Sequence, residues 1–433
     1  MLSKKEAEDY VYKSYLRAEK YLNFNAKDAY KRHPEYSKDI LQQLSQTPTI
    51  TITGSKGKGS VACMISEILQ TEFCVGLMTS PHISNFCERF RVNGKQISDG
   101  DFADCVDRIK PCFDKIESIL EPSEYISPIG IQAAVALTYF NAKHTDFNVI
   151  EHGKGAKYDD VTNIKHQYAV INTIFPEHTR ELGETIEEIA EDKVYTITDD
   201  VKIVVTAEQN ENVLQIIRRR ASEKKCKLLE YGRNFSAENI RFSKSGMIFD
   251  VITAKNKYSD IKLPLLGVHQ AKNCALAISL CELILPQINI GKLKQKLLTT
   301  NWPGRQEIIC TEPFILLDAC INRFNAVSVK KTINELNIPK VVTIIGIPDD
   351  KDFSGVAEIM ADISEKIILT KSSNQHYIFT ENQIEILKLK KIEAVYANSL
   401  NEALNLAKNY KLPIVILGTT SIISDAKTLK LGQ

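Results

Sequence analysis

The chain has 433 residues, of which 43% are hydrophobic, so it is long enough to bury the cores of two or three domains. Its 55 basic and 54 acidic residues nearly cancel, which argues against a nucleic-acid-binding or membrane-binding surface at the level of the whole chain. The charged N-terminus lacks the apolar core of a signal peptide, and no stretch reaches the roughly 18 apolar residues that a membrane span needs. The ten cysteines are scattered without a CxxC pair, which indicates free thiols and predicts a cytoplasmic protein.

In chain order, residues 4–22 show the apolar spacing of a helix, and short β-rich runs then alternate with helical stretches. This alternation favours a mainly parallel sheet covered by helices on both faces, so we predict an α/β fold. Residues 227–262 differ, because short strands with polar turns follow one another there, and we expect a small antiparallel addition to the main sheet. The predicted strands of this part are 49–53, 74–79, 147–151, 168–174 and 201–206, and the predicted helices are 60–71, 129–143 and 270–285.

A domain boundary is predicted near residues 301–304, because the alternation of strands and helices starts again after them. We therefore expect a P-loop domain over residues 1–300 and a smaller, Rossmann-like C-terminal domain over residues 301–433. The predicted strands of the second domain are 314–317, 340–345, 366–369, 394–396 and 414–417, and the predicted helices are 327–336, 353–363 and 400–409.

The most specific motif is the loop Gly54-Ser55-Lys56-Gly57-Lys58-Gly59-Ser60, between a predicted strand and a predicted helix. Glycines allow backbone N–H groups to surround phosphate oxygens, and the following helix N-terminus adds partial positive charge. Lys58 is expected to reach the β- and γ-phosphates of ATP, and Ser60 to help place Mg²⁺. The loop is shorter than the GxxxxGK[ST] pattern. The alternative, an ordinary glycine-rich turn, is disfavoured by the flanking elements and the two lysines.

Further motifs follow along the chain: TSPH at 79–82 with ERFRVNG at 88–94, Glu151 at a strand end, EHT to Lys193 at 177–193, LGVHQAKN at 266–273, WPGRQE at 302–307 and DDKD at 349–352. Together with the glycine-rich loop, they resemble the folylpolyglutamate and dihydrofolate synthases, a branch of the Mur ligase superfamily. The motifs keep the order and similar spacing of that family over nearly the whole chain. The P-loop domain is accordingly expected to be of the Mur ligase central type.

The resemblance implies an ATP-dependent, Mg²⁺-requiring ligase that phosphorylates a carboxylate and joins it to an amine through the acyl-phosphate. It implies a folate-like acid and glutamate as substrates, and we expect a monomer without nucleic-acid or membrane partners. Positioning and charge neutralisation do most of the work in phosphoryl transfer. The catalytic residues implied are Lys58, His178, Lys193 and Arg305, and the metal ligands implied are Ser60, Ser80, Glu151, His178 and Lys193.

For Lys193 the resemblance implies a carbamate, whereas helical spacing alone allows an ordinary surface lysine paired with Glu188 or Glu191. For the nucleotide, it places Gln270 and Asn273 on the adenine side. It also implies that Arg305 crosses from the hinge between the domains to the phosphates. A planar guanidinium suits that contact because it offers paired donors that stay charged. The resemblance also gives Asp318 a hydrogen bond to the ribose.

Three segments depart from the family pattern. In residues 318–323, Ile321 replaces a histidine, which removes one polar contact. The stretch 153–163 is one residue longer than in the family and carries different charges. Glu177 stands before His178 where an aspartate is usual. These departures leave three alternatives open: the same chemistry on a different acid and amino acid, an ATP-binding protein that has lost ligation, and a plain P-loop NTPase or kinase.

Overall fold

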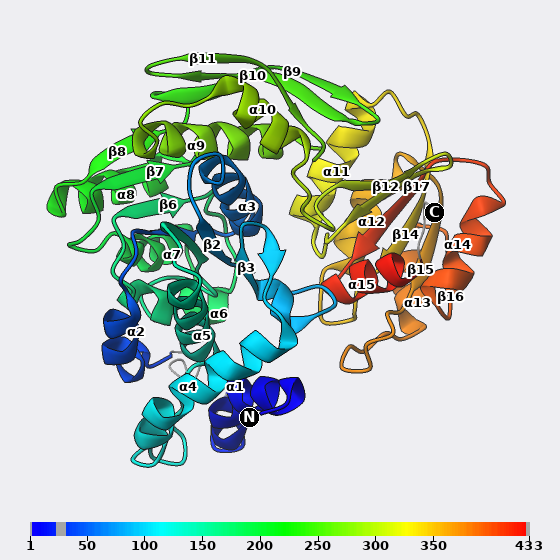
Figure 1. Ribbon diagram of the computed structural model, residues 1–433. Helices are drawn as coiled ribbons and strands as arrows, with labels where there is room; N and C mark the ends of the chain where they lie inside the picture. The colour runs from blue at the N-terminus through cyan, green and yellow to red at the C-terminus, as the bar shows by residue number, and fades with distance from the viewer. Residues whose placement is uncertain (1, 23–31, 430–433) are drawn as a thin grey trace. The chain divides into compact units, whose positions relative to one another are not determined.

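The computed structural model describes residues 2–22 and 32–429, and the chain divides into two compact units, each with its own central sheet (Figure 1). The first unit comprises Met1–Ala237, Val251–Tyr258 and Lys272–Lys296, and the second comprises Glu238–Asp250, Ser259–Ala271 and Leu297–Gln433.

An eight-stranded sheet forms the centre of the first unit. Its strands are β1 (Thr49–Thr53), β2 (Val75–Met78), β3 (Phe90–Val92), β4 (Lys95–Gln96), β5 (Phe147–Glu151), β6 (Tyr168–Ile171), β7 (Ile203–Thr206) and β8 (Lys227–Glu230). Their order is β4-β3-β2-β5-β1-β6-β7-β8. The parallel strands are β2, β5, β1, β6, β7 and β8, in their spatial order, whereas β3 and β4 form an antiparallel edge. The predicted α/β fold with a mainly parallel sheet is confirmed.

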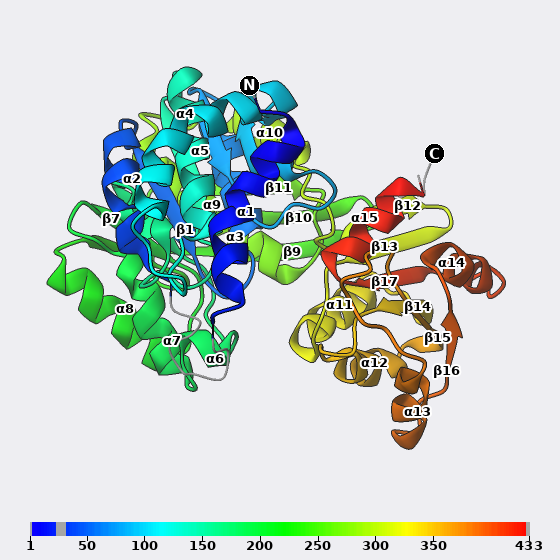
Figure 2. The ribbon, with the colours of Figure 1, turned by 90° about the horizontal axis from the view of Figure 1, so that it is seen from below.

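Helices cover both faces of this sheet. Because parallel crossovers are right-handed, α3, which leads from β1 to β2, and α5, which precedes the return to β5, lie on opposite faces. Helices α1, α4 and α5 pack side by side and, with α2, share one apolar core (Figure 1, Figure 2). The helices up to residue 298 are α1 (Lys4–Glu19), α2 (Lys38–Leu44), α3 (Lys58–Leu69), α4 (Asp99–Glu117), α5 (Pro128–Ala142), α6 (Thr179–Leu182), α7 (Ile186–Lys193), α8 (Glu211–Glu223), α9 (Val268–Ile284) and α10 (Ile290–Leu298).

The strand-rich segment at residues 227–262 differs from the prediction. Its first strand, β8, joins the main sheet parallel to β7. The other three, β9 (Phe235–Ser243), β10 (Gly246–Thr253) and β11 (Lys257–Leu263), form a separate sheet of order β11-β10-β9. Their connections of two and three residues are too short for parallel crossovers, so neighbouring strands run antiparallel. The segment is therefore a sheet of its own and not an addition to the main one.

A six-stranded sheet forms the centre of the second unit. Its strands are β12 (Glu307–Thr311), β13 (Phe314–Asp318), β14 (Val341–Gly346), β15 (Ser364–Thr370), β16 (Ala394–Ala397) and β17 (Ile414–Gly418). The order is β12-β13-β17-β14-β15-β16, and all strands except the edge strand β12 run parallel. Figure 2 shows α11, α12 and α13 on one face and α14 and α15 on the other. These helices are α11 (Arg323–Glu335), α12 (Phe353–Ala361), α13 (Asn382–Leu389), α14 (Leu400–Lys408) and α15 (Thr420–Thr428).

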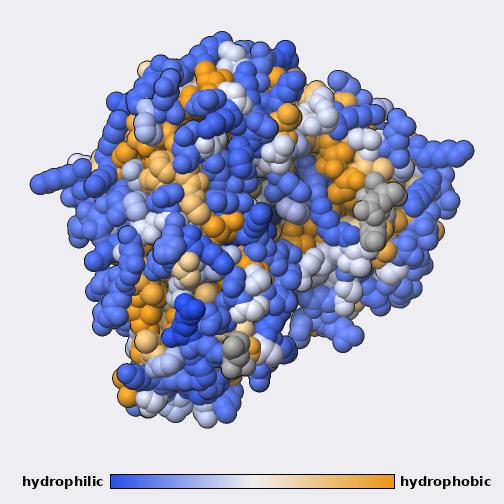
Figure 3. Space-filling model, viewed as in Figure 1, coloured by the Kyte–Doolittle hydropathy of each residue, from blue (hydrophilic) through white to orange (hydrophobic). Residues whose placement is uncertain are grey.

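The surface is mainly hydrophilic on the face shown in Figure 3, where apolar residues form small, separate groups. Among the residues that the structure describes, no helix is both long and apolar enough to cross a bilayer. All ten cysteines are free thiols, as the sequence predicts.

Candidate active site at the carboxyl ends of the first sheet

The glycine-rich loop lies between β1, a central strand of the sheet, and the N-terminus of α3. Gly54 and Gly57 have φ angles of 137° and 80°, a region that favours glycine. A Cβ atom at Gly57 would lie 2.6 Å from Nδ2 of Asn172, and one at Gly54 would lie 2.8 Å from Cβ of Asn172. The loop is thus packed closely against the end of β6. Ser55 joins it there as well, because its Oγ donates a hydrogen bond to the Phe175 carbonyl at 2.9 Å.

Two lysines converge on one carbonyl of this loop. The Nζ atom of Lys58 donates to the Gly54 carbonyl at 3.1 Å, and the Nζ atom of Lys193 donates to the same carbonyl at 3.0 Å. Lys193 is fully buried and also pairs with Oε1 of Glu177 at 3.0 Å. Burial lowers the pKa of Lys193, and the nearby charge of Lys58 acts in the same direction, while Glu177 opposes both. Two lysine amines therefore meet at the phosphate loop, and that of Lys193 is partly balanced by the Glu177 carboxylate.

Ser80 and Glu151 are brought together at the same edge of the sheet. Glu151 ends β5, Ser80 follows β2, and these two strands are neighbours. The Oε2 atom of Glu151 accepts a hydrogen bond from the Ser80 backbone N–H at 3.0 Å. Glu151 is buried, and Ser80 is half-buried. The contact places residue 80 beside the Glu151 carboxylate at the carboxyl ends of the parallel strands, where ligands of open α/β sheets bind.

The remaining implied metal ligands are placed differently. Ser60 is buried in the first turn of α3. His178 precedes α6 with a φ of 48°, its side chain is 49% exposed, and its Nδ1 lies 3.9 Å from Oε2 of Glu181. Within the described ranges 2–22 and 32–429, no cluster of three or more His, Cys, Asp or Glu side chains could hold a metal ion. Ser80 is thus hydrogen-bonded to Glu151, and Lys193 and Lys58 share one acceptor. His178 lies beside Glu181 instead.

The residues implied in nucleotide binding fall in both units. Asn273, in the first unit, accepts a hydrogen bond from Nδ2 of Asn172 at 3.1 Å and lies beside Gly57. Gln270 is buried and belongs, with Arg305 and Asp318, to the second unit.

Arg305 is half-buried and follows Gly304, whose φ is 67°. Asp318 ends β13, and its Oδ2 accepts the Gln306 backbone N–H at 2.9 Å. The other oxygen, Oδ1, is buried without a hydrogen-bond partner among the described residues. A buried acceptor of this kind suits a ligand hydroxyl.

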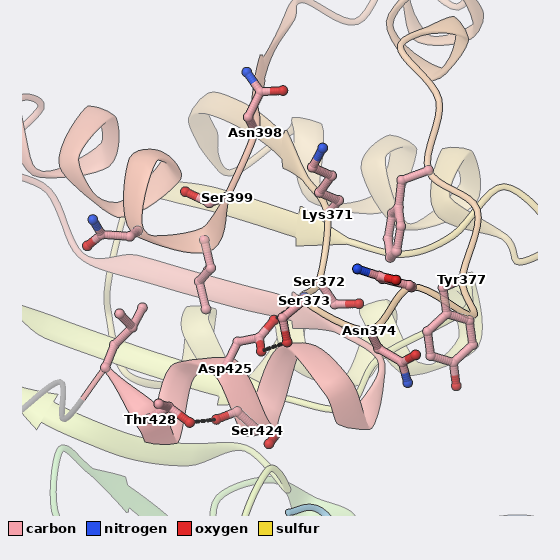
Figure 4. Close-up of a pocket in the computed structure, with 15 residues that line it drawn as sticks. Lys371, Ser372, Ser373, Asn374, Tyr377, Asn398, Ser399, Ser424, Asp425 and Thr428 are labelled. Atoms are coloured by element: carbon pink, nitrogen blue, oxygen red, sulfur yellow. Dashed lines mark hydrogen bonds between the residues drawn. The ribbon is translucent and has the colours of Figure 1, made fainter.

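A pocket of about 660 Å³ lies in the second unit, between the segments that follow β15 and β16 and helix α15 (Figure 4). Helices α13 and α14, which follow these strands, lie on opposite faces of the sheet, so the pocket is at a topological switch point. Its lining residues include Lys371, Asp425 and several with hydroxyl or amide side chains. The carboxylate of Asp425 accepts hydrogen bonds from the Ser373 backbone N–H at 2.8 Å and from its Oγ at 2.5 Å. The Oγ atom of the buried Ser372 has no hydrogen-bond partner in the described part of the chain.

Several residues of the candidate site were not found from the sequence. Asn172 anchors the phosphate loop, and its signal is a polar residue directly after a buried strand. Asp192 accepts the Ala156 backbone N–H at 2.7 Å and so ties residue 156 to the helix that carries Lys193. Glu177 is noticeable in the sequence only as a departure, yet it is the ion-pair partner of Lys193.

Comparisons with known proteins agree with these features. The family model described as "Mur ligase middle domain" matches residues 52–281. A dihydrofolate synthase/folylpolyglutamate synthase from Bacillus subtilis is 30% identical over 325 residues, which are 73% of this chain and 74% of that protein. A probable bifunctional folylpolyglutamate synthase/dihydropteroate synthase from Haloferax volcanii is 28% identical over 326 residues; they cover 73% of this chain but only 38% of that longer protein.

Solved structures show the same fold. A folylpolyglutamate synthase from Mycobacterium tuberculosis, complexed with ADP and AMPPCP, matches with a TM-score of 0.84 at 23% identity over 97% of this chain and 99% of that one. A structure described as an FPGS-AMPPCP-folate complex matches with a TM-score of 0.81 at 24% identity over both complete chains.

Proposed function

Because the chain belongs to the Mur ligase family, with folylpolyglutamate and dihydrofolate synthases as its relatives, we propose that this ATP-dependent, ADP-forming ligase adds L-glutamate to a folate. The observation that carries the proposal is the convergence of Lys58 and Lys193 on the Gly54 carbonyl, in the unit that also joins Ser80 to Glu151. We also propose that residues 1–300 form the ATP-binding domain and residues 301–433 the second ligase domain. Ten free thiols suit the reducing cytoplasm.

The chemistry needs stabilisation of negative charge more than it needs a nucleophile from the protein. A substrate carboxylate oxygen attacks the γ-phosphorus of ATP, ADP leaves, and an acyl-phosphate forms. The amine of glutamate then attacks the acyl carbon, and inorganic phosphate leaves with one oxygen of the original carboxylate. Lys58 and the backbone N–H groups of the loop before α3 are suited to hold the phosphates during the first step.

Magnesium fits part of the proposed ligand set. Glu151 is a buried carboxylate that accepts the Ser80 backbone N–H, and a carboxylate and a serine hydroxyl are oxygen ligands of the kind that Mg²⁺ takes together with water and phosphate oxygens. Bound there, Mg²⁺ would neutralise charge on the β- and γ-phosphates. We propose Ser60 as a further ligand near the nucleotide, and His178 as a ligand on the resemblance alone.

We propose that Lys193 carries a carbamate. Only the neutral amine adds to CO₂, forming an N–C bond and releasing a proton. The lowered pKa of the buried Lys193 favours that neutral form. Glu177, 3.0 Å away, accepts a hydrogen bond from the unmodified amine and would have to turn from the resulting anion.

For the nucleotide, we propose that Asn273 and Gln270 contact the adenine side, that Asp318 accepts a hydrogen bond from the ribose, and that Arg305 neutralises the phosphates. The unpaired Oδ1 atom of Asp318 supports its role, because a ribose hydroxyl is a donor of the right kind.

The pocket of the second unit offers the chemistry of an amino-acid site. Glutamate carries two carboxylates and one ammonium group at neutral pH. Lys371 can pair with a carboxylate, and Asp425 can pair with the ammonium group. We propose that glutamate binds there, so Lys371→Met is expected to raise KM for glutamate about tenfold with little change in KM for ATP. An unchanged KM for glutamate would place the amino acid elsewhere.

The test of the function is ADP release from Mg²⁺-ATP with glutamate, with dihydropteroate and tetrahydrofolate supplied separately. We expect ADP release that depends on both the acid and glutamate. ADP release that needs neither would indicate a plain ATPase. Binding of ATP without release under any combination would indicate a protein that has lost ligation.

A further inference from the structure

The loop at residues 153–163 is one of the segments in which the sequence departs from the family pattern, and the structure shows where its buried charge lies. The loop begins two residues after Glu151, and residues 160–163 form its terminal 3₁₀ turn. Two of its ionisable side chains, Asp159 and Asp160, are buried, and so is His152, which directly precedes the loop. They therefore act inside the protein and do not face a substrate.

Asp159 closes this loop on itself. Its Oδ2 atom accepts the backbone N–H groups of Gly153 at 3.1 Å and Lys154 at 3.0 Å, and its Oδ1 atom accepts the Val161 N–H at 3.2 Å. One carboxylate thus holds both the first residues of the loop and its last turn. Any shift of Asp159 would release the chain directly beyond Glu151.

Two side chains from outside the loop stabilise the buried charge. Nη1 of Arg32 donates to Oδ2 of Asp159 at 2.7 Å, and Nδ1 of His152 lies 3.3 Å from Oδ1. Burial alone would raise the pKa of Asp159, but His152, Arg32 and the Lys154 N–H outweigh it and lower the pKa to about 2. The carboxylate is therefore ionised at neutral pH, and removing one partner of such a buried pair is costly.

The same loop contacts the elements that carry the candidate phosphate and metal residues. The Gly155 carbonyl accepts a hydrogen bond from Oγ1 of Thr53 at 3.1 Å, directly before Gly54. The Ala156 N–H donates to Asp192, the neighbour of Lys193. A loop fixed by Asp159 is therefore joined to three functional positions, since it also continues from Glu151.

From this geometry we propose that Asp159, with Arg32 and His152, is a positioning residue that holds the 153–163 loop closed and thereby fixes the phosphate-side geometry of the site. The inference rests on the proposed function for its catalytic consequence. It also gives the buried charge of Asp159 a role inside the protein that needs no change of substrate.

The test compares Asp159→Asn and Arg32→Met with Asp146→Asn. Asp146 is a matched control, because it also accepts a backbone N–H, that of Cys74, but is exposed and lies where β5 begins, at the opposite end of that strand from Glu151. The first readout is independent of activity: the rate of trypsin cleavage after Lys154 and Lys157, followed by mass spectrometry. Local opening governs such cleavage. We expect cleavage to be about tenfold faster in both loop variants and unchanged in the control.

The second readout is the split between kcat and KM. We expect kcat to fall about tenfold or more while KM for ATP changes less than about threefold, because small misplacements near the reacting groups mainly slow the chemical step. Wild-type cleavage rates, or faster cleavage with unchanged kcat, would overturn the proposal. If Asp159→Asn does not fold, Arg32→Met gives the answer, since it leaves the backbone contacts of Asp159 in place. A wild-type protein inactive on every folate would refute the proposed function, whereas the cleavage rates would still decide whether Asp159 holds the loop.

Discussion

Replacement of Asp160 by asparagine should change how the stability of the protein depends on pH. Asp160 is buried next to Asp159. Its Oδ1 atom accepts a hydrogen bond from Oγ of Ser37 at 2.5 Å, and Oδ2 has no hydrogen-bond partner among the residues described. Burial is the main cause that raises its pKa to about 7, and the neighbouring carboxylate adds to it, against the opposing effects of Ser37, Arg32 and Ser127.

The direction and the size of the change in stability follow from the difference between the pKa of Asp160 in the folded and in the unfolded protein. Because the pKa rises from 3.8 to about 7 on folding, the folded protein binds the proton more tightly. This contribution to stability is complete below pH 4 and is lost as the pH rises towards 7. At about 1.4 kcal/mol for each pKa unit, the wild type should lose about 3 kcal/mol between pH 4.5 and pH 8 through this group. Asp159 titrates at about pH 2, outside this window.

The assay is urea unfolding followed by circular dichroism at pH 4.5 and pH 8. Asparagine is neutral at both pH values, so Asp160→Asn should remove this pH-dependent loss of stability. Any decrease in the free energy of unfolding that the buried amide causes is equal at both pH values. Asp39→Asn, an exposed change in α2 close to Ser37, serves as the control and should behave like the wild type. An Asp160→Asn protein with the pH dependence of the wild type would refute the reasoning.

Three other changes test the site. Gly57→Ala should weaken ADP binding about tenfold in calorimetry, because a Cβ would crowd Asn172 and the φ of 80° disfavours alanine; wild-type affinity would contradict the proposed phosphate loop. Lys193→Ala should lower kcat about a hundredfold, and short carboxylic acids should restore part of it if a carbamate forms; full activity of the variant would exclude the carbamate. Arg305→Ala should lower kcat about tenfold or more without changing the circular dichroism spectrum, and an unchanged kcat would remove Arg305 from the phosphate site.

The central sheets and the phosphate loop could be predicted from the sequence because their signals are local. Buried strands such as β1 are short apolar or β-branched runs, and the loop after β1 has a specific composition. Helix α4 was not predicted, and Pro111 inside it argues against a helix in local terms. The edge strand β12 and the separate sheet β9–β11 depend on pairing partners that periodicity does not identify.

The contacts that position the site are mostly long-range and could not be predicted. Arg32 and Asp159 are 127 residues apart in sequence, and Asn172 meets Asn273 over 101 residues. Nothing in the local pattern around Asp159 distinguishes a buried, ionised carboxylate from an exposed one. The motifs of the sequence predict the kind of reaction. The contacts that position Glu151 and Lys193 can be seen only in the structure.

The measurement that tests the central claim most directly follows oxygen from the acid to phosphate. The protein is incubated with Mg²⁺-ATP, glutamate and a folate whose reacting carboxylate carries ¹⁸O, and the inorganic phosphate is analysed by mass spectrometry. An acyl-phosphate route predicts one ¹⁸O atom in each phosphate released, together with a product one glutamyl unit heavier. Phosphate without ¹⁸O, or an unchanged folate mass, would contradict the account.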